Sequence, residues 1–217
     1  MIVIPHLMRN PLTSILDSHF RGNDNLFSDV LQTTSLCLIY MSSKSAKILL
    51  TGLPGCGKTT AIMKIIEELD CPSVAGFYTE EIRENNTRKG FRWKCLDGAG
   101  GILAHVDIKG RSKLGKYSVD VAGFEKSVVP ILDAEQSDAQ LFVIDEIGKM
   151  ECLSRKFIAA VHRLFDSDKS VLATVARKGT GFISEVKNYP GTKLLNLTIE
   201  NRERSIGEVL KILSFMK

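Results

Sequence analysis

The stretch from Leu49 to Thr60 is the feature that most restricts what this chain can fold into. Gly52, four intervening residues and then Gly57-Lys58-Thr59 match the pattern of a phosphate-binding loop. Apolar residues precede the loop at Ala46–Leu50, and apolar residues at helical spacing follow it. The pattern therefore predicts a strand, a glycine-rich loop and a helix in that order, which a chance glycine-rich turn would not supply.

The residue types in this loop have physical reasons to be there. Glycines let the backbone amides wrap closely around a phosphate group, and the start of the following helix adds further N–H donors. Lys58 has the reach to contact β- and γ-phosphates, and the Thr59 hydroxyl is suited to ligating Mg²⁺. We therefore predict nucleotide binding, with Lys58 also catalytic and Mg²⁺ as cofactor, by Gly52, Leu53, Pro54, Gly55, Cys56, Gly57, Lys58, Thr59 and Thr60.

A second stretch, Leu141–Glu151, resembles a Walker B strand. Its apolar run suits a parallel strand buried on both faces, and two carboxylates follow at the end where open α/β sheets place their ligands. Asp145 is expected to hold the Mg²⁺ shell, and Glu146 to orient or deprotonate the attacking water. The predicted nucleotide-binding residues here are Leu141, Phe142, Val143, Ile144, Asp145, Glu146, Ile147 and Gly148.

The order of elements predicts an α/β fold. Strands alternating with helices favour a mostly parallel sheet covered on both faces. Between the two motifs, three strand-like segments within residues 74–106, separated by turns near Asn85-Asn86 and Gly98–Gly101, predict an antiparallel β-hairpin insertion. Its Arg83, Arg88, Arg92 and Trp93 are either a cover for a nucleotide base or solvated charge with a packing aromatic, and we favour the second interpretation.

Further polar groups have two interpretations each. Thr174, near the end of a predicted strand, is either a sensor of the γ-phosphate or a β-branched core residue. The basic loop Arg177–Gly181 either approaches phosphate or is solvated. An additional cation for the reaction could come from Lys149, from Arg202 or from an arginine of the hairpin.

Composition sets limits on the class of protein. With 217 residues, 44% hydrophobic and 25% charged, the chain is expected to bury one substantial core. Its five cysteines lack zinc-ligand spacing, which argues against structural zinc or a disulfide scaffold and favours a reducing, cytoplasmic compartment. No run approaches the roughly 20 apolar residues of a membrane span. A net charge of +4 without a clustered basic stripe argues against nucleic acid as a partner.

Residues 1–44 differ in character from the rest. Prolines, glycine and asparagines interrupt their apolar residues, so we expect a disordered extension followed by one domain over residues 45–217. The segment Leu16–Asp24 resembles translated copies of dispersed palindromic repeats. Met41 directly precedes the polar run that leads into the first strand, which is the basis for a hypothesis that Met41 is the true start.

Taken together, the motifs resemble those of small P-loop nucleoside triphosphatases, a family with thermostable archaeal and bacterial members and a human cancer-related homologue. The residues that carry the resemblance are Thr51–Thr60, Gly76–Arg83, Gly115–Tyr117, Ile144–Glu151 and Glu200–Arg202. The resemblance implies a RecA-like sheet and Mg²⁺-dependent hydrolysis of nucleoside triphosphates (ATP, GTP, CTP and UTP) to diphosphate and phosphate, with loose base preference.

Two other classes of function share the phosphate-binding loop. A small-molecule or nucleoside kinase is one, but Glu146 beside Asp145 favours water as the acceptor. A nucleotide-dependent switch or nucleic-acid motor subunit is the other, and the chain lacks both a guanine-reading Asn-Lys-x-Asp sequence and an extended basic or aromatic surface. Hydrolysis is therefore the first expectation.

Overall fold

Three strands form the buried centre of the sheet in the computed structural model, which describes residues 45–69, 71 and 73–214. They are β1 (Lys47–Gly52), β7 (Leu141–Ile147) and β8 (Ser170–Val175), and every residue in them except Glu146 is buried. Continuous apolar runs without alternation suit strands covered on both faces. The hypotheses about residues 1–44, including the start at Met41, lie outside the described residues.

The sheet is mixed, with the strand order β5-β6-β4-β3-β2-β7-β8-β1-β9. The predicted parallel α/β core is confirmed by strands β2, β7, β8, β1 and β9, since each neighbouring pair among them runs parallel. The predicted hairpin continues this same sheet in antiparallel pairings. The remaining strands are β2 (Val74–Glu84), β3 (Thr87–Cys95), β4 (Gly100–His105), β5 (Lys113–Leu114), β6 (Tyr117–Val119) and β9 (Thr192–Leu197).

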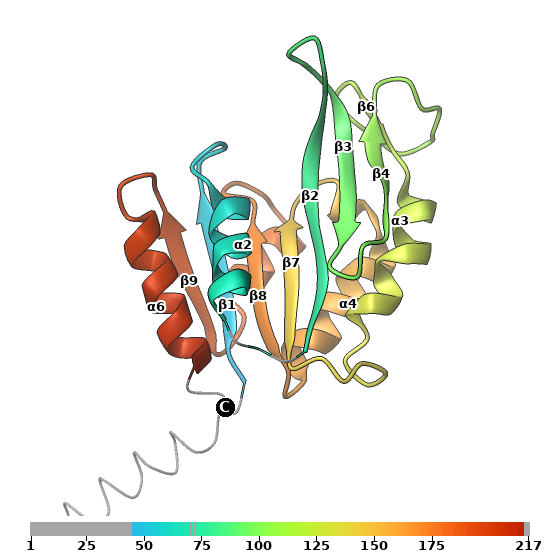
Figure 1. Cartoon of the computed structure of the whole chain (residues 1–217). Coiled ribbons are helices and arrows are strands. Elements are labelled where there is room, and N and C mark those ends of the chain that lie inside the picture. The colour runs from blue at the N-terminus through green and yellow to red at the C-terminus, as the bar shows by residue number, and fades with distance from the viewer. Residues whose placement is uncertain (1–44, 70, 72, 215–217) are drawn as a thin grey trace, which may run out of the picture. The chain divides into compact units, whose positions relative to one another are not determined.

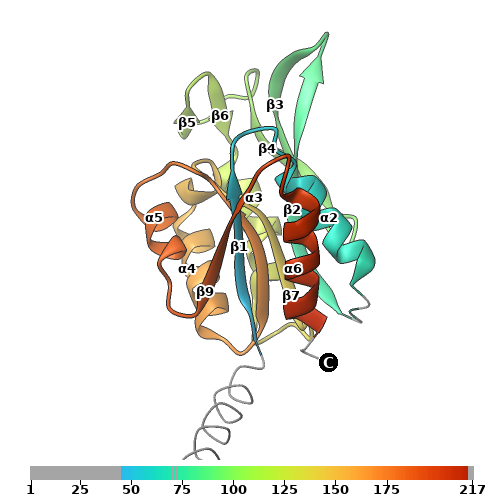
Figure 2. The same ribbon diagram turned by 90° about the vertical axis from the view of Figure 1, so that its left-hand side faces the viewer.

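Helices cover both faces of the parallel half, as Figures 1 and 2 show. On one face lie α2 (Lys58–Glu68) and α6 (Arg202–Ser214). On the other lie α3 (Val121–Ser127), α4 (Arg155–Asp166) and α5 (Phe182–Lys187). The described residues also include two 3₁₀ turns, η1 (Val129–Leu132) and η2 (Glu151–Leu153). No helix among these described segments is long and apolar enough to span a membrane.

Local sequence signals account for several of these boundaries. Ser154 caps α4, because its hydroxyl accepts a hydrogen bond from the Phe157 amide at 2.9 Å. The helical segment around Pro130 is divided into α3 and η1, with the proline in the first turn of η1 where its missing N–H costs no helix bond. Beneath α3 and α4, Phe77 packs edge-on against Phe124 and Phe157, with ring centroids 5.4 and 6.1 Å apart.

The β2–β3 hairpin extends beyond the carboxyl edge of the parallel strands. Tyr78 lies opposite Asp145 at that edge, and β2 runs on to Glu84 before the chain turns. Asn85 and Asn86 make the turn with φ of 47° and 60°, which confirms the predicted asparagine turn. Figure 1 shows the hairpin rising from the same end of the sheet as the loop after β1. The hairpin therefore stands beside the phosphate-binding loop.

Candidate active site

The phosphate-binding loop joins the end of β1 to the start of α2. Gly55 and Gly57 have φ of 79° and 91°, in the left-handed region that favours glycine. At Gly52 a Cβ would lie 2.4 Å from the Leu197 carbonyl oxygen of the adjacent strand, so a side chain does not fit there. No described side chain caps the first turn of α2, so its amide groups are directed at the space in front of the loop.

Asp145 is anchored beside the first turn of α2 by two hydroxyl groups. Its carboxylate accepts a hydrogen bond from Thr59 Oγ1 at 2.5 Å and another from Thr174 Oγ1. Thr174 is fully buried on β8, the strand that separates β1 from β7, so it acts on the site through Asp145. Burial raises the pKa of Asp145, while the hydrogen bonds from Thr174 and Thr59 oppose the rise. The threonines therefore hold this carboxylate in one position.

Glu146 faces Lys58 at the entrance to the site. The β7–β8 register shifts between Ile144 and Ile147, and such an irregularity re-aims the side chains it contains. Glu146 Oε2 lies 3.9 Å from Lys58 Nζ, and the Glu146 side chain is 33% exposed. Burial raises the pKa of Glu146; the Lys58 charge opposes the rise and the Asp145 charge adds to it. Glu146 is thus the solvent-accessible carboxylate of the pair.

A third carboxyl group, that of Glu151, lies beneath this pair. The turn η2 brings Glu151 back under Gly148, where a Cβ would meet Glu151 Oε2 at 2.7 Å and Glu146 Oε1 at 2.9 Å. Burial raises the pKa of Glu151 to about 8, and the Glu146 and Asp145 charges add to the rise. The sequence interpretation gave Glu151 no role. The only signal in the sequence was its position five residues after Glu146, at the end of the second motif.

An open cleft of about 620 Å³ connects the phosphate-binding loop with the hairpin. Its floor is the loop and the acidic end of β7, and its far wall is the hairpin with Arg88 and Phe91. Several cationic side chains line it besides Lys58, namely Arg88, Lys149, Arg177 and Lys178. A cleft lined by cations from both the phosphate-binding loop and the hairpin is suited to a polyanionic ligand.

The structure separates the predicted site residues into two sets. Those on the cleft wall are Gly52, Leu53, Pro54, Gly55, Lys58, Thr59 and Glu146, with Asp145 directly behind Thr59. Those away from the wall include Cys56, which is buried behind the loop, Gly57 and the exposed Thr60. The apolar residues Leu141, Phe142, Val143, Ile144 and Ile147 are buried in the core, and Gly148 is buried between two carboxyl groups.

The candidate cations also separate by position. Lys149, Arg88 and the Arg177-Lys178 pair line the cleft. Arg202 instead lies beside the loop, where a Cβ on Gly57 would be 2.7 Å from its Nη1. Trp93 is buried beneath Gly101 and is a packing residue, as the favoured interpretation of the hairpin expected.

The donor atoms beside α2 fit a hard divalent cation. Among the described residues no group of three or more His, Cys, Asp or Glu side chains is placed to hold a metal. The Thr59 hydroxyl and the Asp145 carboxylate nevertheless meet next to the uncapped start of α2. Mg²⁺ is usually bound by one or two protein oxygens together with water and substrate phosphates, so these two donors suit it.

Several known proteins are similar to this chain in sequence. A family model described as NTPase matches residues 47–210. The nucleoside-triphosphatase THEP1 of Thermotoga sp. (strain RQ2) is 43% identical over 169 residues, which cover 78% of this chain and 96% of that protein. The human cancer-related nucleoside-triphosphatase is 36% identical over 75% of this chain and 94% of its own length.

Two solved structures share the fold. The crystal structure of THEP1 from the hyperthermophile Aquifex aeolicus superposes with a TM-score of 0.70 at 36% identity, covering 77% of this chain and 98% of the other. The solution structure of a human cancer-related nucleoside triphosphatase gives a TM-score of 0.66 at 35% identity, covering 80% and 100%.

Proposed function

Since this chain belongs to the NTPase family, whose model matches residues 47–210, we propose that it hydrolyses nucleoside triphosphates to nucleoside diphosphate and phosphate with Mg²⁺. The observation that carries the proposal is the placement of Glu146. It is a solvent-accessible carboxylate, 3.9 Å from Lys58, at the front of the phosphate-binding loop. A group in that position can act on a water molecule next to the terminal phosphate.

The loop residues bind and orient the triphosphate. The amides of the loop and of the uncapped α2 turn donate to phosphate oxygens, and Lys58 adds a positive charge. Thr59 and Asp145 would hold Mg²⁺, which when bound would supply positive charge to offset that of the phosphate groups. Thr174 keeps Asp145 oriented for that task.

Glu146 then handles the water. With a raised pKa it is a stronger base than an exposed glutamate, and it accepts a proton as the water oxygen approaches phosphorus. When Lys58 turns to the phosphate, Glu146 loses its nearest cation, which raises its basicity further. The oxygen–phosphorus bond to the diphosphate breaks in line, and Lys58 and the loop amides stabilise the charge that develops.

The charged and N–H groups of the site are suited to phosphate, which does not distinguish one base from another. Backbone amides, Lys58 and the cations of the cleft recognise charge, which every nucleoside triphosphate carries. We therefore propose that the enzyme accepts ATP, GTP, CTP and UTP with loose base preference.

The test is phosphate release from a panel of these four triphosphates, with and without Mg²⁺ and without any added acceptor. Release is expected with all four and to depend on Mg²⁺. Glu146→Gln should retain nucleotide binding and lose turnover by about 10² to 10⁴-fold, the usual contribution of a general base. Glu67→Gln, at an exposed position on α2, is the matched control.

Two results would contradict this proposal. Strict dependence on an added acceptor would identify a kinase instead of a hydrolase. Wild-type turnover by the Glu146→Gln variant would show that Glu146 is not the base that accepts the proton from water.

A further inference from the structure

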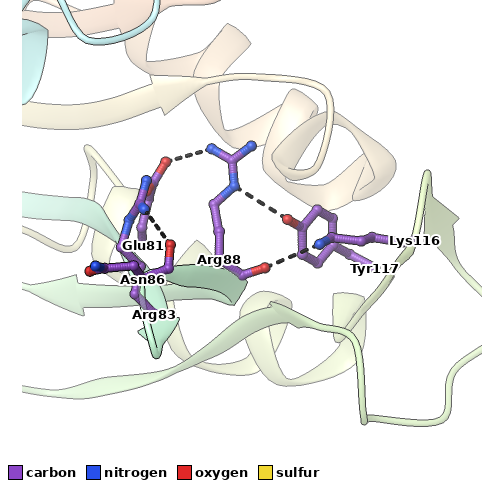
Figure 3. A network of polar contacts seen from close by, with 6 residues as sticks. All are labelled: Glu81, Arg83, Asn86, Arg88, Lys116 and Tyr117. Atoms are coloured by element: carbon purple, nitrogen blue, oxygen red, sulfur yellow. Dashed lines mark hydrogen bonds and ion pairs between the residues drawn. The ribbon is translucent and has the colours of Figure 1, made fainter.

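Arg88 is held in a defined orientation on the far wall of the cleft. Its Nη1 donates to Glu81 Oε1 at 2.5 Å, and its Nε donates to the Tyr117 hydroxyl at 3.2 Å. The guanidinium carbon lies 5.2 Å from the centre of the Phe91 ring. Figure 3 shows the Arg88 guanidinium between Glu81 and Tyr117, which come from β2 and β6. The side chain is therefore pre-oriented although it is 44% exposed.

The Glu81 carboxylate is shared between two arginines. Arg83 Nε donates to its second oxygen, Oε2, at 2.7 Å, and Arg83 also donates to the Asn86 carbonyl oxygen at 3.1 Å. Both ion pairs of Glu81 are partly exposed, and solvent-exposed pairs of this kind contribute little to folding. A ligand with several negative charges can compete for Arg88 at that small cost, while Arg83 keeps Glu81 paired.

The strand register places Arg88 across the cleft from the phosphate-binding loop. Tyr78 lies opposite Asp145, and Glu81 is three residues further along β2, or about 10 Å at ~3.3 Å per residue. The Arg88 guanidinium lies at the level of Glu81, and both residues line the cleft with Lys58 and Glu146. The terminal phosphate of a nucleotide on the loop would occupy the space between these two levels.

We propose that Arg88 is the additional cation of the reaction and that it exchanges Glu81 for oxygens of the terminal phosphate when a nucleoside triphosphate binds. Tyr117 and Phe91 hold the Nε edge and the face of the guanidinium, so the Nη1 now donated to Glu81 is the part that becomes available. A planar fork of this kind matches phosphate oxygens in pairs. The inference rests on the proposed hydrolytic function.

Arg88 makes no covalent bond in this step. The water oxygen bonds to phosphorus, the bond to the diphosphate oxygen breaks, and the water proton passes to Glu146. Arg88 donates to the equatorial oxygens of the transferred group as their charge is redistributed, from the side opposite Lys58. Its contribution is therefore larger in the transition state than in the bound ground state.

The first test measures turnover and binding of a transition-state mimic. Arg88→Ala should lower kcat by about 10² to 10³-fold with KM within a few-fold of wild type, as expected for a group that acts in the transition state. It should weaken binding of ADP with Mg²⁺ and aluminium fluoride by a similar factor while leaving ADP binding unchanged. Arg88→Lys should recover only part of the loss.

The control is Arg92→Ala. Arg92 lies on the same strand, is exposed and is absent from the cleft wall, so its removal should leave both measurements at wild-type values. Thermal unfolding of each variant tests whether the hairpin is intact. Equal binding of the aluminium fluoride complex by wild type and Arg88→Ala would overturn the proposal.

The second test uses Glu81→Gln, which weakens the resting partner of Arg88. If Arg88 serves the substrate, this variant should raise kcat/KM, with a sign opposite to that of Arg88→Ala. If the network serves only to hold the hairpin, both variants should lower turnover and the melting temperature together, and the proposal fails. A wild-type enzyme that releases no phosphate would instead refute the proposed function itself.

Discussion

Two lysines, one at the start of β1 and one just after the phosphate-binding loop, show how one residue type serves different purposes. At the amino end of β1, Lys47 is 7% exposed and its Nζ donates to three backbone carbonyl oxygens, those of Leu164 (2.8 Å), Ser167 (3.0 Å) and Lys169. At the start of α2, the Lys58 side chain is 13% exposed and its charged partner is Glu146 at 3.9 Å. The fold uses all three donors of the first lysine and keeps those of the second available for a ligand.

The difference follows from what surrounds each ammonium group. Lys47 lies at the carboxyl end of α4, where backbone carbonyl oxygens and the helix dipole favour a cation. Burial lowers the pKa of Lys47 to about 8, and the Asp168 and Asp166 charges partly oppose that effect. Lys58 lies at the amino end of a helix, which repels cations and attracts phosphate. A bound anion such as phosphate would therefore stabilise the Lys58 ammonium group at this position.

The largest expected effect comes from removing the Lys58 ammonium group. Lys58→Met should lower phosphate release by about 10² to 10³-fold, as for loss of one preorganised charge donor in an active site. Its free energy of unfolding should stay within about 1 kcal/mol of wild type, because the partner at 3.9 Å is partly solvated. Phosphate release and urea unfolding check the two halves of the prediction.

Lys64→Met, on the exposed side of α2, is the matched control for this substitution. Severe unfolding of Lys58→Met would remove the contrast between the two lysines.

The converse effect is expected at the amino end. Lys47→Met should lower the free energy of unfolding by about 2 to 3 kcal/mol, because buried carbonyl oxygens lose their donors. Turnover per folded molecule should remain within about twofold, since Lys47 lies at the end of the sheet opposite the cleft.

Lys193→Met is the control, since Lys193 pairs with Glu208 at the surface and such pairs contribute about 0 to 1 kcal/mol. A loss of turnover with unchanged stability in Lys47→Met would break the comparison.

The smallest expected effect concerns pH and the buried carboxyl group beneath the site. The pKa of Glu151 in the folded protein, about 8, is above its ordinary value of 4.5, so between these values the folded state binds more protons than the unfolded state. Stability from this group is therefore greatest below pH 4.5 and is lost as pH rises towards 8. Glu151→Gln cannot titrate at this position and lacks this loss.

The measurement is urea unfolding of wild type and Glu151→Gln at pH 5 and pH 8.5 without Mg²⁺. The wild type should lose on the order of 2 to 4 kcal/mol relative to the variant between the two values. A constant difference between the two proteins would show that Glu151 titrates outside this range.

Local sequence patterns were sufficient for the fold class and for the strand, loop and helix that carry the candidate site. The spacing Gly52…Gly57-Lys58-Thr59 predicts a loop between a strand and a helix, and the structure has β1, the loop and α2 in that order. The apolar run before Asp145 predicts a buried strand, which is β7. Both predictions depend only on interactions between residues close in sequence and on burial, which the apolar pattern reports directly.

Patterns were insufficient where a residue's role depends on a distant partner. The apolar residues 141–144 were expected at the nucleotide, and the structure places them in the core behind it. Thr174 was ambiguous between phosphate and core until β8 placed its hydroxyl on Asp145. Nothing in the local sequence of Glu151 or Arg88 distinguishes a buried carboxyl or a cleft-lining arginine from ordinary surface charge.

The sequence by itself determined that this chain presents a phosphate-binding loop and an Asp145-Glu146 pair at the ends of two strands, because glycine spacing and apolar runs act locally. Only the tertiary structure decided that these two ends meet, that Lys47 is satisfied while Lys58 is left open, and that the hairpin brings Arg88 to the opposite wall. These are matters of strand order and register, and they depend on contacts between residues as far apart as Thr59 and Asp145. Such contacts are set by how the whole sheet assembles.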